Sequence, residues 1–582
     1  MEPGGTASHT TVPWLKKLAE RGTHVVSVTP LRNDTPEFLN AQWLAPRPNT
    51  DVALMMGLAH TLVDDGLHDS KFLETYAVGG DTFLAYLTGE ADGTPKSADW
   101  ASEICDIPAD TIRELARRMA AGRTMIACSY SLQRGDHGEQ TFWMTMALAC
   151  ILGQIGLPGG GFGFGYGSMH GQGNPVPKMP SYTHSAGPNP TGSFIPVARV
   201  TDMLLNPGME YDFDGERRTY PDIKLVYWCG GNPFHHHQDL NRLLDGWRRP
   251  DTVIVNEPWW TPTAKLADIV LPATTTLERN DVGASSRDRF LVAMKQIVPP
   301  QHASRNDYDI FSGLAGRLGI KDAFTEGRDE DAWLRHLYDQ ARDGAGALAN
   351  RMPDFDAFWE QGLLELDAPE KPHVVYESFR ADPTANPLPT PSGKFEICCA
   401  EIAGFGYDDC PEHPVWQEPA EWLGGETAKD WPLHLISNQP AHKLHSQLDF
   451  VGPSLAAKLQ GREPAFLAPA DADARGIKDG DLVRLYNDRG ETLAIAVVSD
   501  HVRQGVVQLP TGAWFDPSDW AKAGTLERHG NPNVLTLDKG TSKLGQGPIS
   551  HTTLVDVAKV VETAEPSDPF NLPDVVSRPA AE

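Results

Sequence analysis

The segment Leu225–Gln238 constrains the fold of this chain most, because its apolar run LVYWC stops at two glycines, an asparagine and a proline. A helix is expected to begin near Asp239. An α/β sheet presents backbone N–H groups to a phosphate through this order of strand, glycine-rich turn and helix N-terminus. Any tight turn between a strand and a helix also uses glycines, so a loop that binds nothing is at least as good an interpretation. The segment alone therefore predicts a parallel α/β sheet and leaves ligand binding open.

Helical and strand patterns alternate on both sides of this segment. Helices between strands predict parallel sheets that are covered by helices. The expected helices are Pro13–Arg21, Asp51–Asp65 and Ala109–Ala121, and the expected strands are His24–Thr29, Thr124–Tyr130, Ile223–Cys229, Thr252–Asn256 and Asp268–Leu271. By contrast, Leu157–Gly173 is too rich in glycine for regular structure. Its interleaved aromatic residues favour close packing, for example against a ligand, over a flexible surface loop.

From Pro432 the sequence changes to short alternating segments. The expected strands are Leu433–Ser437, Asp481–Tyr486, Thr492–Val498 and Val506–Leu509, with the hairpin turn NDRG at Asn487–Gly490. This pattern predicts a small β-barrel. The 582-residue chain is thus predicted to be a multidomain α/β protein with a C-terminal barrel. The expected domain ranges are 1–170, 171–425 and 430–562, and the proline-rich, acidic residues 563–582 are expected to form an extended tail.

Composition excludes several classes of partner. The formal net charge of −28 argues against nucleic acid or an anionic membrane surface, since both require a positive surface. The longest apolar run, Met144–Leu157, is short for a bilayer span and favours a core helix.

The 7 cysteines contain no C-x-x-C pair, which argues against a cysteine-ligated iron–sulfur cluster within this sequence. No export signal is recognisable near Met1, so we expect a cytoplasmic location. A preceding segment with a twin-arginine signal would instead direct the protein to the periplasm.

Several motifs follow one another in a fixed order along nearly the whole chain. They are APRPNTDVALMMGLAHTL at Ala45–Leu62, SLQRGDHGEQ at Ser131–Gln140, LGQIGLPGGGFGFG at Leu152–Gly165, WCGGNPFHHHQDLNR at Trp228–Arg242, TPTAKLADIVLPATTTLERND at Thr261–Asp281, RNDYDIF at Arg305–Phe311, KLHSQ at Lys443–Gln447, GDLVRLYNDRG at Gly480–Gly490 and HGNPNVLTLDKGTSKLGQG at His529–Gly547. In this order they resemble the molybdopterin oxidoreductases of the dimethyl-sulfoxide reductase family. Within it they are most similar to the biotin sulfoxide and trimethylamine N-oxide reductases.

The resemblance implies a cofactor with two molybdopterin guanine dinucleotides around one molybdenum atom, and a barrel of the double-psi type. Contacts to such a cofactor come from loops of several domains. By resemblance, the residues expected at one nucleotide end are Thr29, Pro30, Asn49, Thr50 and Asp51, and those expected near a pterin are Tyr130, Ser131 and Arg134. Asp51 is also a good helix cap, and the two interpretations are equally supported.

Further residues are expected at the second dinucleotide and over the pterins. By resemblance, Asn232 and the backbone that follows it would bind the second pyrophosphate, and Asn256, Thr276 and Asp307 would reach its ribose and guanine. Five residues of the barrel would close over both pterins, namely Gln439, His445, Gln447, Asn533 and Ser550. The family more often has histidine at the position of Gln439. His235–His237 invite a metal-site interpretation, but consecutive residues cannot all face one ion from a regular element, so solvated or supporting histidines are favoured.

The resemblance implies oxygen-atom transfer from an S-oxide, with biotin sulfoxide and related sulfoxides preferred because of ERNDVGASSRDRF at Glu278–Phe290. Trimethylamine N-oxide or dimethyl sulfoxide are the alternative substrates. Electrons would come from a separate donor protein. Family members carry a further portion before the region that matches Met1, and this portion holds the serine that ligates molybdenum. No catalytic residue and no protein ligand of the metal is therefore assigned here. A catalytically incomplete cofactor-binding fragment or split subunit is a further alternative.

Overall fold

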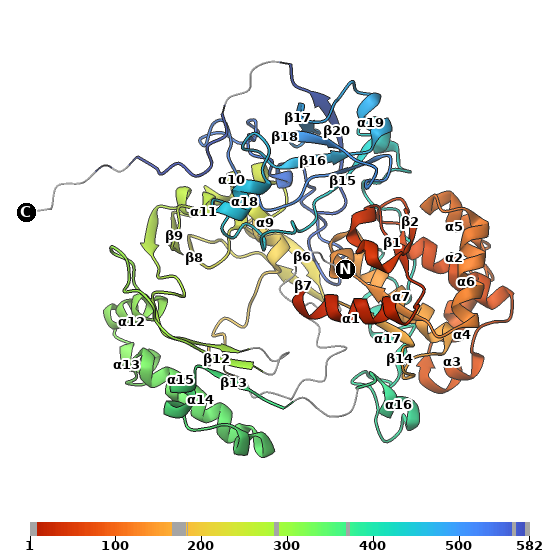
Figure 1. The fold of residues 1–582 in the computed structure, drawn as a ribbon, viewed down its shortest axis with the longest axis horizontal. Coiled ribbons are helices and arrows are strands. Elements are labelled where there is room, and N and C mark those ends of the chain that lie inside the picture. Colours follow the sequence, from red (N-terminus) through yellow and green to blue (C-terminus); the bar gives the residue numbers. More distant parts are fainter. Residues whose placement is uncertain are drawn as a thin grey trace, which may run out of the picture.

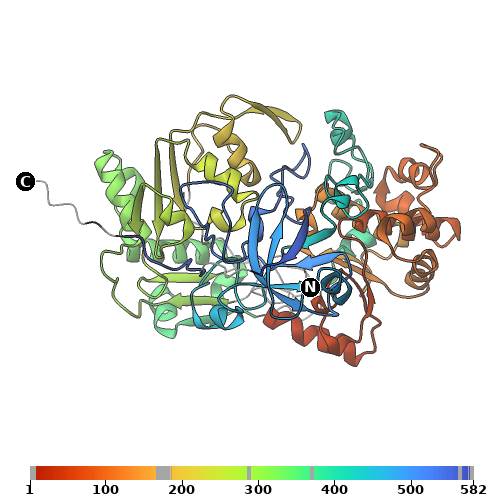
Figure 2. The same cartoon turned by 90° about the horizontal axis from the view of Figure 1, so that it is seen from above.

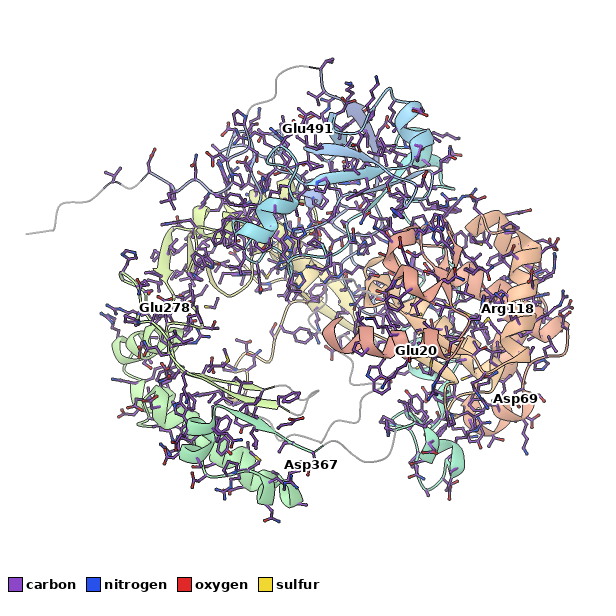
Figure 3. All side chains as sticks on the ribbon, viewed as in Figure 1. Glu20, Asp69, Arg118, Glu278, Asp367 and Glu491 are labelled. Atoms are coloured by element: carbon purple, nitrogen blue, oxygen red, sulfur yellow. The ribbon has the colours of Figure 1, made fainter. Side chains whose placement is uncertain are left out.

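The computed structural model describes residues 8–165, 182, 184, 186–284, 290–367, 373–561, 566–574 and 576. Residues 166–173 of the glycine-rich segment Leu157–Gly173, and residues 285–289 of Glu278–Phe290, lie outside these residues. A first, mainly helical body and a second α/β body flank the C-terminal barrel (Figure 1). Seen from above, the barrel lies between the two bodies (Figure 2). Figure 3 places Asp69 and Arg118 on the first body and Glu278 and Asp367 on the second.

The first body is built around α2, which contacts α5, α6 and α7. Eight of the side chains from Val52 to Leu62 are buried apolar groups, so α2 is a core helix rather than a surface helix. The elements are α1 (Ser8–Glu20), α2 (Asp51–Asp64), α3 (Ser70–Tyr76), α4 (Gly80–Leu87), α5 (Ala98–Cys105), α6 (Ala109–Ala121), α7 (Gly138–Leu152), β1 (Val26–Val28), β2 (Gln42–Leu44), β3 (Ala77–Val78), β4 (Met125–Cys128) and β5 (Gly161–Phe164). The expected helices at Asp51 and Ala109 are confirmed, whereas α1 begins before Pro13.

The expectation of no regular structure at Leu157–Gly173 is wrong for Gly161–Phe164, which form strand β5. This strand pairs in parallel with β4, with Met125 opposite Gly161. Its sequence GFGF alternates with a period of two, as a strand does. The glycines are buried, and a Cβ at Gly161 would lie 3.1 Å from the Ile155 Cα. Glycine therefore permits close approach of the backbone here, as the close-packing interpretation expected.

A later segment also packs on the first body. Its elements are α16 (Glu377–Ala381), β14 (Phe395–Glu396) and α17 (Ala400–Phe405). Strand β14 pairs in parallel with β3, and Phe379, Phe395 and Ile397 belong to the same buried cluster as the side chains of α2. The chain therefore returns to the first body after building the second one.

The second body contains the parallel sheet that the segment Leu225–Gln238 predicts. Its strand order is β10-β9-β8, which confirms the three expected strands. An antiparallel sheet β11-β12-β13 lies next to the helices α12 to α15 (Figure 1). The elements are α8 (Val200–Leu205), α9 (Pro233–His236), α10 (Leu240–Trp247), α11 (Pro262–Lys265), α12 (Asp307–Arg317), α13 (Lys321–Thr325), α14 (Glu330–Gly344), α15 (Phe355–Gln361), β6 (Glu210–Phe213), β7 (Glu216–Thr219), β8 (Leu225–Cys229), β9 (Thr252–Glu257), β10 (Ile269–Pro272), β11 (Asp281–Ala284), β12 (Phe290–Met294) and β13 (Leu363–Glu365).

The C-terminal body is a closed barrel with the strand order β15-β19-β16-β18-β17-β20. Four of its strands were expected from the sequence, and β16 and β20 were missed. The turn Asn487–Gly490 joins β17 and β18 as an antiparallel hairpin, as its NDRG sequence predicts. The elements are β15 (Leu433–Ile436), β16 (Pro464–Leu467), β17 (Leu482–Tyr486), β18 (Glu491–Val498), β19 (Val506–Gln508), β20 (Leu554–Lys559), α18 (Gly452–Ala457) and α19 (Pro469–Asp473).

The described part of the expected tail has no helix or strand, but it is not free in solvent. Pro569 is buried, and the ring of Phe570 lies 5.4 Å from the ring of Trp514. Ser567–Phe570 therefore lie against the barrel. Within the residues that the structure describes, none of the helices combines the length and apolar character that a bilayer crossing requires.

Candidate functional site

Segments from all three bodies meet at one place. The backbone N–H of His551, which follows the barrel segment at Ser550, donates to the Arg134 carbonyl of the first body at 3.0 Å. The Asn232 amide, at the start of α9 in the second body, donates to the Ser446 hydroxyl of the barrel at 3.4 Å. The rings of His235 and His445 lie 5.8 Å apart. The structure thus brings together predicted site residues that are hundreds of positions apart in the sequence.

The turn after β8 has the expected left-handed glycines, with φ of 72° at Gly230 and 78° at Gly231. A Cβ at Gly230 would meet no atom within 4 Å, so the backbone here borders open space. Asn232 was expected to bind a pyrophosphate, but its side chain is already held. It accepts from the Thr263 hydroxyl at 2.6 Å and donates to Ser446. The backbone of this turn therefore remains available to a ligand, and the hydrogen bonds of Asn232 hold the turn in its conformation.

The three consecutive histidines are buried or partly buried, so of the two expected interpretations, solvated or supporting histidines, the solvated one is wrong. His235 is 1% exposed and His237 is 4% exposed. Among the residues that the structure describes, neither ring nitrogen of His235 has a hydrogen-bond partner, nor has Nε2 of His237. Burial keeps the pKa of His235 well below its ordinary value. A neutral imidazole has one donor and one acceptor, so these unpaired atoms can bind a polar ligand.

Arg134 supplies positive charge next to these histidines. Burial and the neighbouring His445 and Arg134 lower the pKa of His236 to about 4. Burial and then Arg134 lower the pKa of His551 to about 3. The guanidinium therefore remains charged while the surrounding imidazoles are neutral. This combination suits an anionic ligand that also offers donors and acceptors.

A second set of polar groups lies at the carboxyl ends of β8 and β9. Tyr227 donates through its hydroxyl to the Asn256 Oδ1 at 3.0 Å, and the Asn256 amide donates to the Asp307 Oδ1 at 2.9 Å. The carboxyl ends of parallel strands are the usual ligand edge of an α/β sheet. Thr276, which was expected in the same group, lines an apolar cavity of about 510 Å³ with Leu277 and other residues.

A third set lies at the start of α2. Thr50 is buried at the N-cap position, but its side chain makes no capping hydrogen bond and its hydroxyl donates instead to the Arg47 carbonyl at 2.6 Å. Asp51 is the first residue of α2, so the interpretation of Asp51 as the helix cap is wrong. Asn49 has a φ of 64° and accepts from the Thr552 hydroxyl at 2.7 Å. Asn49 and Asp51 line one small pocket together. The Asp51 side chain therefore remains available to a ligand.

The neighbouring residues Thr29 and Pro30 make contacts within the protein. The Thr29 hydroxyl donates to the Asp34 Oδ2 at 2.8 Å. The Pro30 carbonyl accepts from the Arg503 N–H of the barrel at 2.9 Å. Pro30 thereby joins the first body to the barrel, whereas the Thr29 contact lies within the first body. Their predicted contact with a nucleotide stays a prediction.

The remaining predicted residues lie on the loops around Arg134 and the barrel. The ring of Tyr130 packs 5.6 Å from that of Phe164, and the hydroxyl of Ser131 lies 2.9 Å from that of Ser129. The Gln439 amide donates to the Lys443 carbonyl at 2.8 Å. His445 and Gln447 are exposed. Asn533 is 3% exposed and donates to the His235 carbonyl, and Ser550 is 7% exposed with its carbonyl accepting from Ser437 at 3.4 Å.

Asp51 gives a testable pH dependence. Burial raises the pKa of its carboxyl to about 6, whereas an aspartate in an unfolded chain titrates near pH ~4. The folded state holds this proton more tightly, so stability falls as the pH rises from about 4 to about 6. The loss is about 3 kcal/mol of the free energy of unfolding. We expect Asp51→Asn to remove this part of the pH dependence in urea unfolding curves recorded between these values.

The matched control is Asp64→Asn at the other end of α2, where the side chain is exposed. It removes one charge from the same helix, and it should leave the pH dependence between pH ~4 and ~6 unchanged. Identical pH dependence in Asp51→Asn and the parent chain would contradict the assignment.

The donor set fits an extended anionic cofactor with polar ring edges. It offers unpaired buried nitrogens at His235 and His237, open backbone at Gly230, a guanidinium at Arg134 and the carboxylate of Asp51. A closed barrel between the first, mainly helical body and the second, α/β body brings these groups together (Figure 1). Such a fold and site define a protein that binds a large cofactor across domains.

Comparison with known proteins identifies the class. Residues 5–317 match the family model of the molybdopterin oxidoreductases, and residues 433–554 match that of the molydopterin dinucleotide binding domain. The chain therefore belongs to the molybdopterin oxidoreductase family. It is an oxidoreductase with a molybdenum–molybdopterin cofactor, and the motif resemblance is confirmed.

The chain is similar over most of its length to individual reductases of this family. The chain is 52% identical to a biotin sulfoxide reductase of Cereibacter sphaeroides, over 96% of this chain and 74% of the relative. It is 50% identical to a dimethyl sulfoxide/trimethylamine N-oxide reductase of the same organism, over 94% of this chain and 68% of the relative. Among solved structures, acetylene hydratase from Pelobacter acetylenicus covers 94% of this chain with a TM-score of 0.67 and 20% identity, and 75% of that protein is covered. The last similarity concerns the fold.

Sequence reasoning missed several residues that shape the site. Thr263 fixes Asn232, Thr552 bonds Asn49, and Ser446 joins the barrel to α9. Ser446 lies within the motif KLHSQ, and Thr552 lies two positions after Ser550. Both could have been found by considering the sequence neighbours of the predicted residues. Only the position of Thr263 within the motif that begins at Thr261 could have indicated its role.

Proposed function

We propose that this protein reduces an S-oxide, biotin sulfoxide or a related sulfoxide, to the sulfide. The observation that carries the proposal is the 52% identity to a biotin sulfoxide reductase over 96% of this chain. The overall reaction consumes two electrons and two protons and releases the sulfide and water. The bound cofactor would supply two-electron oxygen-atom transfer at molybdenum.

We further propose that the cofactor is the bis(molybdopterin guanine dinucleotide) form. Two separate carboxylate sites support this form, one at Asp51 on the first body and one at Asp307 on the second. A carboxylate can accept from both N1–H and N2–H₂ of a guanine. Arg134, on the first body and near His236 of the second, would compensate the negative charge of the pyrophosphates and pterins. The neutral His235 and His237 would pair with polar edges of the bound group.

We also propose that the electrons come from a separate donor protein. The sequence supports this, because its 7 cysteines contain no C-x-x-C pair that would hold an iron–sulfur cluster. The donor would deliver electrons to the molybdenum through the protein surface near the site.

Trimethylamine N-oxide or dimethyl sulfoxide is the alternative substrate, supported by the 50% identity to the reductase of both compounds. The experiment is an assay with reduced viologen as the electron donor and each oxide in turn. We expect kcat/KM for biotin sulfoxide to exceed that for trimethylamine N-oxide by about tenfold or more. A preference for the N-oxide would support the alternative, and turnover of neither oxide by cofactor-loaded protein would contradict both.

A further inference from the structure

The barrel loop Gln439–Asp449 carries three of the predicted cofactor residues in a strained conformation. His445 has a φ of 52° and Leu448 a φ of 54°, which is the left-handed region that side chains other than glycine and asparagine rarely adopt. Such a conformation persists only where the surroundings determine it. Contacts with the surrounding protein must therefore hold this loop in place before any ligand binds.

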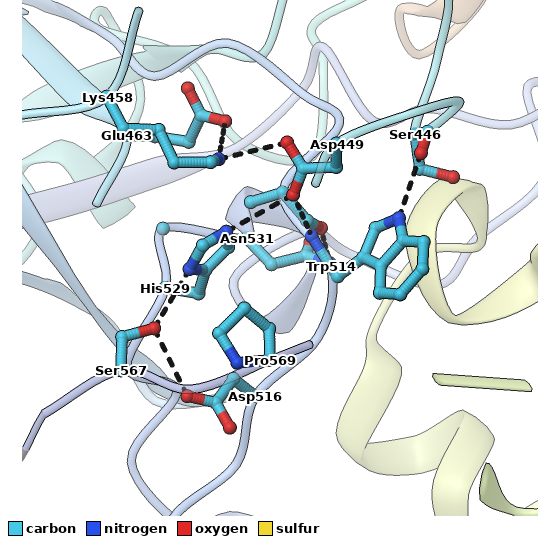
Figure 4. A network of polar contacts seen from close by, with 12 residues as sticks. Ser446, Asp449, Lys458, Glu463, Trp514, Asp516, His529, Asn531, Ser567 and Pro569 are labelled. Atoms are coloured by element: carbon cyan, nitrogen blue, oxygen red, sulfur yellow. Dashed lines mark hydrogen bonds and ion pairs between the residues drawn. The ribbon is translucent and has the colours of Figure 1, made fainter. Parts of the chain in front are cut away.

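The main anchor is the carboxylate of Asp449, which is 0% exposed. Its Oδ1 accepts from the Lys443 Nζ at 2.6 Å and lies 3.0 Å from the Lys458 Nζ. Its Oδ2 accepts from the backbone N–H of Trp514 at 3.1 Å and lies 3.2 Å from the His529 Nε2 (Figure 4). The carboxylate thus ties the end of the loop to Lys443 near its beginning and to three other segments of the barrel.

Glu463 supplies the second carboxylate that pairs with the buried ammonium groups of Lys443 and Lys458. Its Oε1 accepts from both lysines, at 2.8 Å from Lys443 and 2.7 Å from Lys458. Two buried carboxylates therefore face two buried ammonium groups. Removing one partner of such a group leaves an unpaired buried charge, whereas the complete group is held in one geometry.

The middle of the loop is held by the segment Gly512–Trp514. The Trp514 Nε1–H donates to the Ser446 carbonyl at 2.8 Å (Figure 4). At Gly512, with a φ of 114°, an added Cβ would lie 2.4 Å from the His445 carbonyl oxygen and 2.6 Å from the Lys443 Cε. The backbone of this segment therefore presses directly on the loop.

The chain after the barrel adds the outer part of this anchor. The Ser567 hydroxyl lies 2.9 Å from the His529 Nδ1 and 3.2 Å from the Asp516 Oδ2, so His529 is bound on both ring nitrogens (Figure 4). The ring of Phe570 lies 5.4 Å from that of His529. The Pro569 carbonyl accepts from the Lys265 Nζ of α11 at 2.6 Å. Residues 566–574 thereby link the second body to the anchor.

We propose that Asp449 is a positioning residue for the loop Gln439–Asp449, and that residues 566–574 complete its anchor by fixing His529 and Trp514. The loop carries Gln439, His445 and Gln447 to the cofactor in a conformation that exists before binding. Preorganisation of this kind reduces the cost of ordering a binding loop. This inference rests on the proposed cofactor role of the loop.

The experiment measures amide hydrogen exchange in the cofactor-free chain, so that it does not depend on activity. The variants are Asp449→Asn, a chain that stops after residue 561 and a control chain that stops after residue 574. The control retains the contacts of Ser567, Pro569 and Phe570. We expect peptides of the loop to exchange about tenfold faster in the first two variants, while peptides of α2 keep their protection. The control should behave as the parent chain does.

A second readout is the retention of the cofactor by the loaded protein during gel filtration, measured as pterin fluorescence. We expect faster loss in Asp449→Asn and in the chain that stops after residue 561. Unchanged loop exchange in both variants would overturn the proposal. If Asp449→Asn does not fold, the comparison of the two shortened chains decides alone. Faster loop exchange without any cofactor binding by the parent chain would uphold the anchor and refute the proposed function.

Discussion

Replacing Asp538 by asparagine is expected to lower the free energy of unfolding by about 3 kcal/mol. The Asp538 side chain is 4% exposed, and its Oδ1 lies 2.8 Å from an Arg199 nitrogen. Its other oxygen bonds Arg242. Both arginines also pair with Asp202, at 2.6 Å and 2.5 Å. Removing one carboxylate leaves two guanidinium groups with a single partner in a poorly solvated place.

The effect is large because these residues join two bodies. Asp538 belongs to the barrel part of the chain, whereas Arg199 and Arg242 lie at α8 and α10 of the second body. Urea unfolding of the parent chain and the variant measures the change. The matched control is Asp356→Asn, whose carboxylate is 79% exposed and pairs with Arg335. Surface pairs contribute little, so the control should be close to neutral. Equal stabilities of Asp538→Asn and the parent chain would show that the network is dispensable.

Replacing Arg134 by alanine is expected to weaken cofactor binding by about tenfold to a hundredfold, the value of one to two charge-assisted hydrogen bonds. Arg134 is the charged group among the neutral His236, His445 and His551, whose pKa values its presence helps to lower. Its loss would leave the negative charge of the cofactor without this compensation. The measurement is the molybdenum and pterin content of the purified variant.

Two further variants separate charge from fold. Arg134→Lys keeps the charge but loses the planar guanidinium, so we expect an intermediate cofactor content. Arg117→Ala removes an arginine that pairs with Asp65 at the surface of the first body, and it should keep the parent content. A full cofactor content in Arg134→Ala would contradict the role of Arg134.

Local sequence patterns predicted those parts of the fold that depend on neighbouring residues. The glycine turn after β8 follows from the left-handed conformation that glycine adopts without strain. The hairpin at Asn487–Gly490 follows from its turn-forming residues, since the Asn487 side chain accepts from the Arg489 backbone N–H at 3.0 Å. The strand Gly161–Phe164 also obeys a local rule, since GFGF alternates, but its high glycine content concealed the pattern. The alternation of GFGF favoured a strand, whereas its glycine content favoured irregular structure. In the folded protein the segment forms a strand because it pairs with β4.

The candidate site was predictable only as far as motifs mark it. The hydrogen bond between Asn49 and Thr552 joins residues 503 positions apart, and no local pattern indicates such a contact. The burial of His235 likewise arises from tertiary packing, so the sequence alone could not decide between solvated and supporting histidines. Asp449 gave no signal, because a buried carboxylate is recognisable only once its lysine partners are placed around it.

The most direct test of the proposed cofactor site is the molybdenum and guanine-nucleotide content of the purified chain after expression with full cofactor supply. We expect molybdenum and guanine nucleotide in a ratio of one to two, and a lower content of both when Arg134 is replaced by alanine. Molybdenum-free and pterin-free protein that is nevertheless folded, with a cooperative unfolding transition, would contradict the proposed cofactor site.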